Sequence, residues 1–196
     1  MKPKAIKGAT KAHILNVASN LFYRVGIRAV GIDTIVAESD VAKTTLYDHF
    51  ASKDALIHAY LEQNDHIFWE IFEGDPAQQP DDPKQQLLAI FDRLDALIAA
   101  PESLGCPFLS AAAEFPELDQ PGHRSALTHK QKVWSRFHTI AQAIGVSETA
   151  QFADQLLLLL DGAFASKRVF RSYESPARQL KSTVQMLLAA HLAQPN

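Results

Sequence analysis

The chain has 196 residues, of which 47% are hydrophobic and 21% are charged, so it can bury one or two cores without disulfide or metal support. Its one cysteine, Cys106, excludes an intramolecular disulfide framework, and charges interrupt every apolar run before the roughly 20 residues that a membrane-spanning helix needs. Residues 1–11 are basic and lack the apolar region of a secretory signal, so we expect a cytoplasmic protein with no membrane partner.

The net charge of −3 hides an uneven distribution along the chain. Residues 1–53 carry eight basic and four acidic side chains, which gives +4, whereas the remainder carries 11 basic and 18 acidic ones, which gives −7. Such asymmetry predicts a basic functional end joined to an acidic body.

Helical periodicity recurs from end to end, and no segment alternates apolar and polar residues long enough to make a convincing strand. We therefore expect an all-α fold of about nine helices, with residues 73–83 as a surface loop. Thr10 is a suitable cap for the first helix, Gly26 a left-handed stop behind it, and Ser52 a cap for the fourth. The expected helices span about residues 10–25, 32–38, 42–50, 53–72, 84–99, 108–114, 123–144, 147–173 and 176–193.

Residues 31–53 fit a helix, a tight three-residue turn and a second helix, which is the arrangement of a helix-turn-helix DNA-binding module. Helical geometry gathers one set of side chains from the second helix on its inner side and another set on its outer side. The inner set is Ala42, Leu46, His49 and Phe50, and the outer set is Lys43, Thr44, Tyr47 and Asp48. Because an α-helix fits the major groove, we expect the outer set to face DNA.

The candidate DNA-binding residues are Thr34, Lys43, Thr44, Thr45, Tyr47, His49 and Lys53. The side chain of Lys43 can donate to guanine acceptors or to a phosphate, and the two threonines beside it can touch a base edge or a thymine methyl group. The hydroxyls of Thr34 and Tyr47 and the ammonium of Lys53 can reach phosphates and so fix the register. The four lysines among residues 2–11 can follow a phosphate backbone or enter a minor groove.

Several of these residues have a structural alternative. Tyr47 can be a packed aromatic, His49 a structural residue at the edge of the core, and the lysine-rich segment a solvated tail. Asp48 suits a DNA-facing surface only if it accepts from a cytosine amine or forms a local ion pair.

The segment GIDTIVAESDVAKTTLYDHFASKDALI resembles the DNA-binding segment of the TetR family of repressors, and the likeness extends over residues 10–58. The matching positions are Val41, Lys43, Thr45, Leu46, Tyr47, His49, Phe50, Ser52 and Lys53. The resemblance implies about nine helices, a homodimer on a pseudo-palindromic operator in double-stranded DNA, and an inducer-binding body.

Three positions depart from the family pattern. Asp40 replaces the usual turn glycine, so we expect an aspartate in left-handed geometry. Ala42 replaces a capping serine, which leaves Asp40 as the candidate cap of the recognition helix. Thr44 replaces a small glycine next to the bases, and this affects the operator sequence rather than the fold.

The last two expected helices carry apolar residues on most of their surface, and Gly162 permits close helix approach. We expect them to form a four-helix interface with their symmetry mates; the alternative is a monomeric core of long helices. A two-fold dimer would double the DNA contact of one small reading helix.

The stretch 103–124 combines broken helices, small residues and a lone glutamate, which suits the wall or lid of a small-molecule pocket. We expect a mostly apolar pocket for an effector of unknown identity, and Glu114 can either meet the ligand or satisfy a backbone group. The candidate ligand-binding residues are Phe68, Phe91, Phe108, Glu114, Phe115, Trp134 and Phe137. They can equally be core residues, because aromatics at helical spacing usually are.

We therefore predict a ligand-responsive, DNA-binding transcriptional regulator, most simply a repressor, with residues 1–55 as its DNA-binding domain and 56–196 as its effector and dimerisation domain. An effector-free DNA-binding module is one alternative. The other is a small helical enzyme using Cys106, Glu114 and His123 or His129, although no nucleophile motif supports it. No cofactor is expected, and the eight histidines lack the close pairing of a metal site. Cys106 has no flanking basic residue to lower its pKa for redox sensing.

Overall fold

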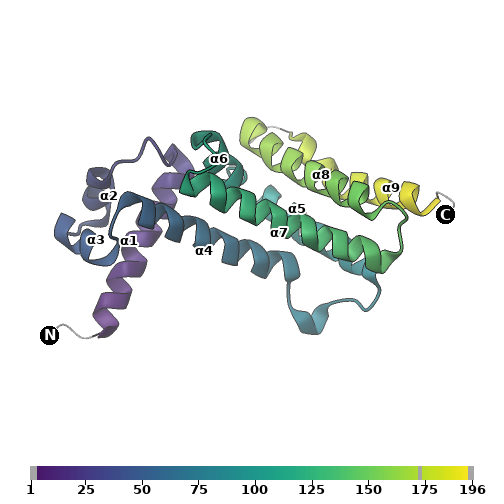
Figure 1. The fold of residues 1–196 in the computed structure, drawn as a ribbon, viewed down its shortest axis with the longest axis horizontal. Helices are drawn as coiled ribbons and strands as arrows, with labels where there is room; N and C mark the ends of the chain where they lie inside the picture. The colour runs from purple at the N-terminus through teal and green to yellow at the C-terminus, as the bar shows by residue number, and fades with distance from the viewer. Residues whose placement is uncertain (1–3, 172–173, 194–196) are drawn as a thin grey trace. The chain divides into compact units, whose positions relative to one another are not determined.

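The computed structural model describes residues 4–171 and 174–193, with side chains from Gly8 onward. Within these residues the chain forms nine α-helices and two short 3₁₀ helices and no strand, which confirms the predicted all-α fold (Figure 1). The elements are α1 (Lys4–Val25), α2 (Ile32–Ser39), α3 (Lys43–His49), α4 (Lys53–Glu73), η1 (Pro76–Gln78), α5 (Pro83–Ala99), α6 (Pro107–Glu114), α7 (Pro121–Ile144), α8 (Thr149–Phe170), η2 (Pro176–Gln179) and α9 (Leu180–Ala193).

Most helix ends lie close to the predicted positions, and two capping predictions can be judged directly. The Ser52 hydroxyl accepts a hydrogen bond from the Ala55 amide at 3.1 Å, which confirms it as a cap of α4. The prediction for Thr10 is wrong, because α1 already begins at Lys4 and Thr10 lies inside it. Alanine and lysine are good helix formers, so the preceding residues extend the helix despite Gly8.

The last helix also differs from its prediction. The chain after Pro176 first makes the 3₁₀ turn η2, capped by Ser175, and α9 starts only at Leu180. Before it, α8 ends at Phe170, and the predicted extension over 172–173 lies outside the described residues.

The chain divides into two compact units, and α4 and α7 each contribute to both. The first unit contains the residues through Asp65 together with Pro107–Leu127. The second contains His66–Cys106 and the chain from Thr128 onward. This division follows packing, whereas the predicted boundary between residues 55 and 56 is a functional one and stays a prediction.

In the first unit, α1, α2 and α3 pack together around a small apolar core. Ile14, Phe22 and Ile35 are buried there, and the Phe22 ring meets the Tyr60 ring edge-on at 5.5 Å. These buried side chains give the short module a core of its own. Fully burying one side chain of this size stabilises a fold by about 1.5–3 kcal/mol.

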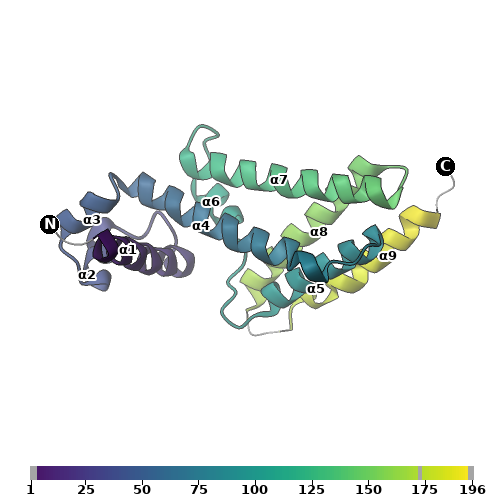
Figure 2. The ribbon, with the colours of Figure 1, turned by 90° about the horizontal axis from the view of Figure 1, so that it is seen from below.

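The second unit is a larger helical body in which α5, α8 and α9 lie side by side (Figures 1 and 2). Its centre is aromatic. The Phe91 and Phe137 rings are stacked with their centroids 5.5 Å apart, and the Phe137 and Phe72 ring centroids are also 5.5 Å apart. None of the helices in the described ranges is both long and apolar enough to cross a membrane.

Candidate nucleic-acid interface

The turn between α2 and α3 has the geometry that the sequence predicts. Asp40 closes α2 with φ 50° and ψ 39°, the left-handed region in which aspartate is better tolerated than most residues. The prediction that Asp40 caps α3 is wrong. Ala42 occupies the N-cap position, and among the described residues this helix end has no side-chain capping hydrogen bond. The amides at the start of α3 are thus left for water or for another acceptor.

The inner and outer faces of α3 are largely as predicted. Leu46 is fully buried and Phe50 is 3% exposed, so these two residues anchor the helix to the core. On the other side Lys43, Thr44 and Asp48 are exposed, and 46% of Tyr47 is exposed. Ala42 is an exception: it was expected on the inner side but is exposed, because it precedes the first helical turn. The exposure of Tyr47 disfavours the packed-aromatic alternative.

Lys43 is held by an ion pair that the sequence did not predict. Its Nζ donates to Oδ1 of Asp33, on α2, at 2.7 Å. This hydrogen bond and the charge of Asp33 raise the pKa of Lys43 above its ordinary value. Both side chains are largely exposed, at 54% and 84%, so the pair contributes little stability and Lys43 can exchange its partner for a phosphate.

The remaining candidates lie on α3 or on the helices before and after it, within the same unit. Thr34 is exposed in the first turn of α2, while Thr45 and His49 are half-buried on α3. Lys53 is the first residue of α4 and is also half-buried; burial lowers its pKa, and the nearby charge of Glu114 opposes that effect. All seven candidates therefore belong to the three helix segments of one compact unit.

The amino-terminal lysines are only partly described. Lys2 lies outside the described residues, and the side chains of Lys4 and Lys7 are not described. Lys11 lies on α1 with its ammonium 5.4 Å from the centre of the Phe50 ring, a cation–π contact at the end of α3. At least this lysine belongs to the folded module.

Glu114, at the end of α6, binds the backbone of the turn that follows α1. Its Oε1 accepts from the Ile27 amide at 3.0 Å and its Oε2 from the Arg28 amide at 2.7 Å. The Arg28 guanidinium donates back to the Glu114 carbonyl at 3.3 Å. Gly26 precedes this contact with φ 112°, as expected of a stop after α1, and a Cβ there would lie 3.3 Å from Oε1. The geometry favours the backbone-satisfying role of Glu114 over contact with a ligand.

The aromatic pocket candidates fall in both units and are mostly packed. In the second unit Phe68, Phe91 and Phe137 are buried, and Phe68 meets the His129 ring at 4.7 Å. Trp134 is half-buried, stacks on His138 and donates its Nε1 to Asp154 at 2.7 Å. In the first unit Phe108 is buried, and the half-buried Phe115 lies against Gly122. These contacts describe core and surface packing, and the pocket itself stays a prediction.

The sequence comparisons point to one class of protein. Residues 14–60 match the family described as bacterial regulatory proteins of the tetR family. The chain is 24% identical over 162 residues to the HTH-type transcriptional regulator YjdC of Escherichia coli, covering 81% of this chain and 83% of YjdC.

The structural comparisons agree with them. SCO4454, a TetR-family transcriptional regulator from Streptomyces coelicolor, superimposes with a TM-score of 0.85 at 31% identity, covering 94% of this chain and 96% of that one. The sav143 protein of Streptomyces avermitilis gives a TM-score of 0.81 at 27% identity, with 94% and 99% covered.

Proposed function

Because the chain belongs to the TetR family of DNA-binding transcriptional regulators, we propose that it is a homodimeric cytoplasmic repressor released from its operator by a small, largely apolar molecule. The observation that carries the DNA-binding part is the division of α3 into a buried face, with Leu46 and Phe50, and an exposed face, with Lys43, Thr44 and Tyr47. A helix anchored in this way can enter a major groove without disturbing its core.

We assign each candidate a role on that basis. Lys43 leaves Asp33 to donate to a guanine or a phosphate, and Thr44 and Thr45 contact base edges. Thr34, Tyr47, His49 and Lys53 contact phosphates, since they lie on α3 or on the helices before and after it in the same unit.

A dimer through α8 and α9 is supported by an apolar surface on both helices. Leu158 on α8 is 72% exposed and Met186 on α9 is 65% exposed. On α8 the exposed stripe continues through Gly162, Ala165 and Val169, residues without large polar side chains. Monomeric proteins rarely leave such a continuous apolar stripe in water, and a second copy offers the matching surface.

The proposed release is a shift of population, in which the effector binds a conformer whose two DNA-binding domains cannot match the operator. The free energy of operator binding weakens by at most the difference between the effector's binding free energies for the two conformers. The aromatic residues of the second unit, Phe68, Phe91, Trp134 and Phe137, are the proposed apolar surroundings of the effector. Phe108 and Phe115 belong to the first unit, and their contact with an effector stays a prediction.

The test is a binding assay with genomic fragments that flank the gene for this protein, measured at several salt concentrations. We expect specific binding that weakens steeply with salt, because each phosphate contact releases a counterion. An equal affinity for operator and scrambled DNA would refute the proposal that this protein is a transcriptional regulator. If compounds from an apolar library never release the DNA, the protein is an effector-free DNA-binding module.

A further inference from the structure

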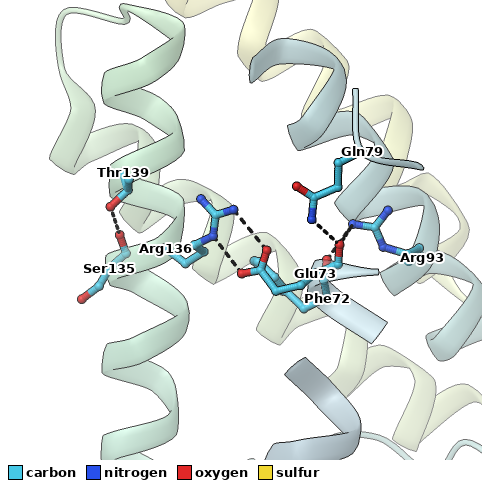
Figure 3. Close-up of polar contacts among 7 residues, drawn as sticks. All are labelled: Phe72, Glu73, Gln79, Arg93, Ser135, Arg136 and Thr139. Carbon is cyan, nitrogen blue, oxygen red and sulfur yellow. Dashed lines mark hydrogen bonds and ion pairs between the residues drawn. The ribbon is translucent and has the colours of Figure 1, made fainter. Parts of the chain in front are cut away.

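The second unit contains a small hollow lined by residues of α4, α5 and α7 and of the segment between α4 and α5. Figure 3 shows four of its lining residues, Glu73, Gln79, Arg93 and Arg136. The enclosed part of the hollow has room for little more than one water molecule, and the rest of the hollow is open to solvent. Its polar lining consists of Glu73, Gln79, Gln86, Arg93 and Arg136. Two guanidinium groups and one carboxylate give this lining a net charge of +1.

Arg93 is fixed by main-chain carbonyls rather than by an acid. Its Nε donates to the Ile71 carbonyl at 2.8 Å, and its Nη2 donates to the carbonyls of Phe72 at 2.7 Å and Glu73 at 3.2 Å. Gly74, with φ 66°, makes this possible, because a Cβ there would lie 2.9 Å from the Arg93 guanidinium carbon. The carbonyls orient the guanidinium but carry no full charge, so most of the charge of Arg93 stays available to a ligand.

Arg136, on α7, also binds Glu73. Its Nε donates to Oε1 of Glu73 at 2.8 Å and its Nη2 donates to Oε2 at 3.1 Å, a bidentate pair that raises the pKa of Arg136. These bonds use one edge of the guanidinium, and Nη1 takes no part in them (Figure 3). Both arginines are thus anchored to Glu73: Arg136 binds the Glu73 carboxylate, and Arg93 binds the Glu73 main-chain carbonyl.

The loop above this cluster is fixed as well. Gln79 donates its amide to the Glu73 carbonyl at 2.8 Å, and Gln86 donates to the Pro80 carbonyl at 2.8 Å. The hollow therefore has walls held by hydrogen bonds on several sides, and Ala89 and Ile90 add apolar surface to it.

We propose that this hollow binds the carboxylate group of a small organic acid, with Arg136 and Arg93 as its cationic partners. The planar guanidinium matches a carboxylate in shape, and Arg136 already binds the carboxylate of Glu73 in this way. Because the enclosed space is small and the hollow opens to solvent, only the carboxylate head would enter it, in place of water, and the carbon part of the ligand would stay at the mouth beside the half-buried Ala89. An effect of the bound acid on DNA binding would rest on the proposed function. Binding of the acid to the hollow does not depend on it.

The experiment measures binding of 4-fluorobenzoate to the full-length protein by fluorine NMR, with 4-fluorobenzamide as the neutral control. We expect the carboxylate to bind and the amide to bind at least about tenfold more weakly, the effect of one charged hydrogen-bonded pair. Equal binding of the two probes would overturn the proposal. So would displacement of the benzoate by an equal concentration of inorganic phosphate, which would indicate a site for anions of any kind.

Two substitutions at the cluster should change the affinity in opposite directions. Glu73→Gln removes the competing carboxylate and raises the charge of the lining to +2, so the dissociation constant of 4-fluorobenzoate should fall about three- to tenfold. Arg136→Gln should raise it about tenfold or more. Arg178→Gln is the matched control, because it breaks the exposed pair of Arg178 with Glu174 on the same unit and should change nothing.

Circular dichroism checks that each variant is folded. If Arg136→Gln does not fold, Glu73→Gln still tests the proposal. An unchanged affinity in Glu73→Gln, or in a folded Arg136→Gln, would overturn the site. If the acid binds as expected but never releases the operator, the proposed release is wrong for this ligand class while the site stands.

Discussion

Replacing Glu114 by alanine removes both acceptors of the Ile27 and Arg28 amides and leaves the turn between α1 and α2 without its anchor. A hydrogen bond to a charged group contributes about 1.5–3 kcal/mol, and a buried donor without a partner costs a similar amount. The contact to Ile27 is partly buried, whereas water can replace the exposed one to Arg28, so we count the first in full and the second hardly at all. The free energy of unfolding should fall by about 2 kcal/mol.

Glu114→Gln keeps one amide oxygen as an acceptor but loses the charge, and should cost about 1 kcal/mol. Urea unfolding followed by circular dichroism measures both values, and fluorescence anisotropy with a labelled operator follows DNA binding in parallel. Operator affinity should fall in Glu114→Ala, because the released turn leads directly into α2. Glu117→Ala is the control: this glutamate is exposed in the same unit, and its loss should change stability by no more than about 0.5 kcal/mol. If Glu114→Ala is as stable as Glu117→Ala, the carboxylate does not hold the turn.

Three further predictions concern the DNA face, the helical body and the proposed dimer. Tyr47→Phe should raise the operator dissociation constant about fivefold, the loss of one phosphate hydrogen bond, while the melting temperature stays the same; unchanged affinity would refute the assigned docking. Asp95 lies half-buried on α5, where burial and then the charge of Asp92 raise its pKa above 3.8, so its ionisation disfavours the folded state. Asp95→Asn should therefore stabilise the protein slightly at pH 7, by an amount that solvent screening keeps small, and the gain should disappear as pH falls below 3.8, where Asp95 is protonated in both states; a gain that persists in acid would contradict this cause. Leu158→Glu places a charge on the exposed stripe of α8 and should convert the dimer to a monomer in sedimentation experiments, with weaker operator binding; a dimer that survives would place the interface elsewhere.

The features that the sequence predicts are those that depend on local pattern. The helical periodicity of residues 42–50 predicts that Leu46 and Phe50 are buried and Tyr47 exposed, and left-handed geometry at Asp40 follows from the turn. Helix ends are less predictable, because Thr10 has the side chain of a cap but the residues before it also favour helix.

Contacts between distant residues could not be predicted from pattern. Glu114 binds amides 86 and 87 residues away, and Arg136 binds a carboxylate 63 residues away. Nothing in either local sequence identifies the partner, because the fold alone brings them together. The pair between Asp33 and Lys43 spans only ten residues, and the helix-turn-helix geometry was a usable signal for it.

That pair also bears on how the protein finds its site. A lysine already neutralised by Asp33 gains less from an arbitrary phosphate than a free one, because it must give up a partner first. Binding to random sequence is almost wholly electrostatic, so this lysine should add less than a full counterion to the salt dependence of non-specific binding. If Lys43 contacts a base at the operator as proposed, Asp33 should weaken non-specific binding slightly more than operator binding. The ratio between the two affinities, more than the absolute strength of binding, determines occupancy in a cell.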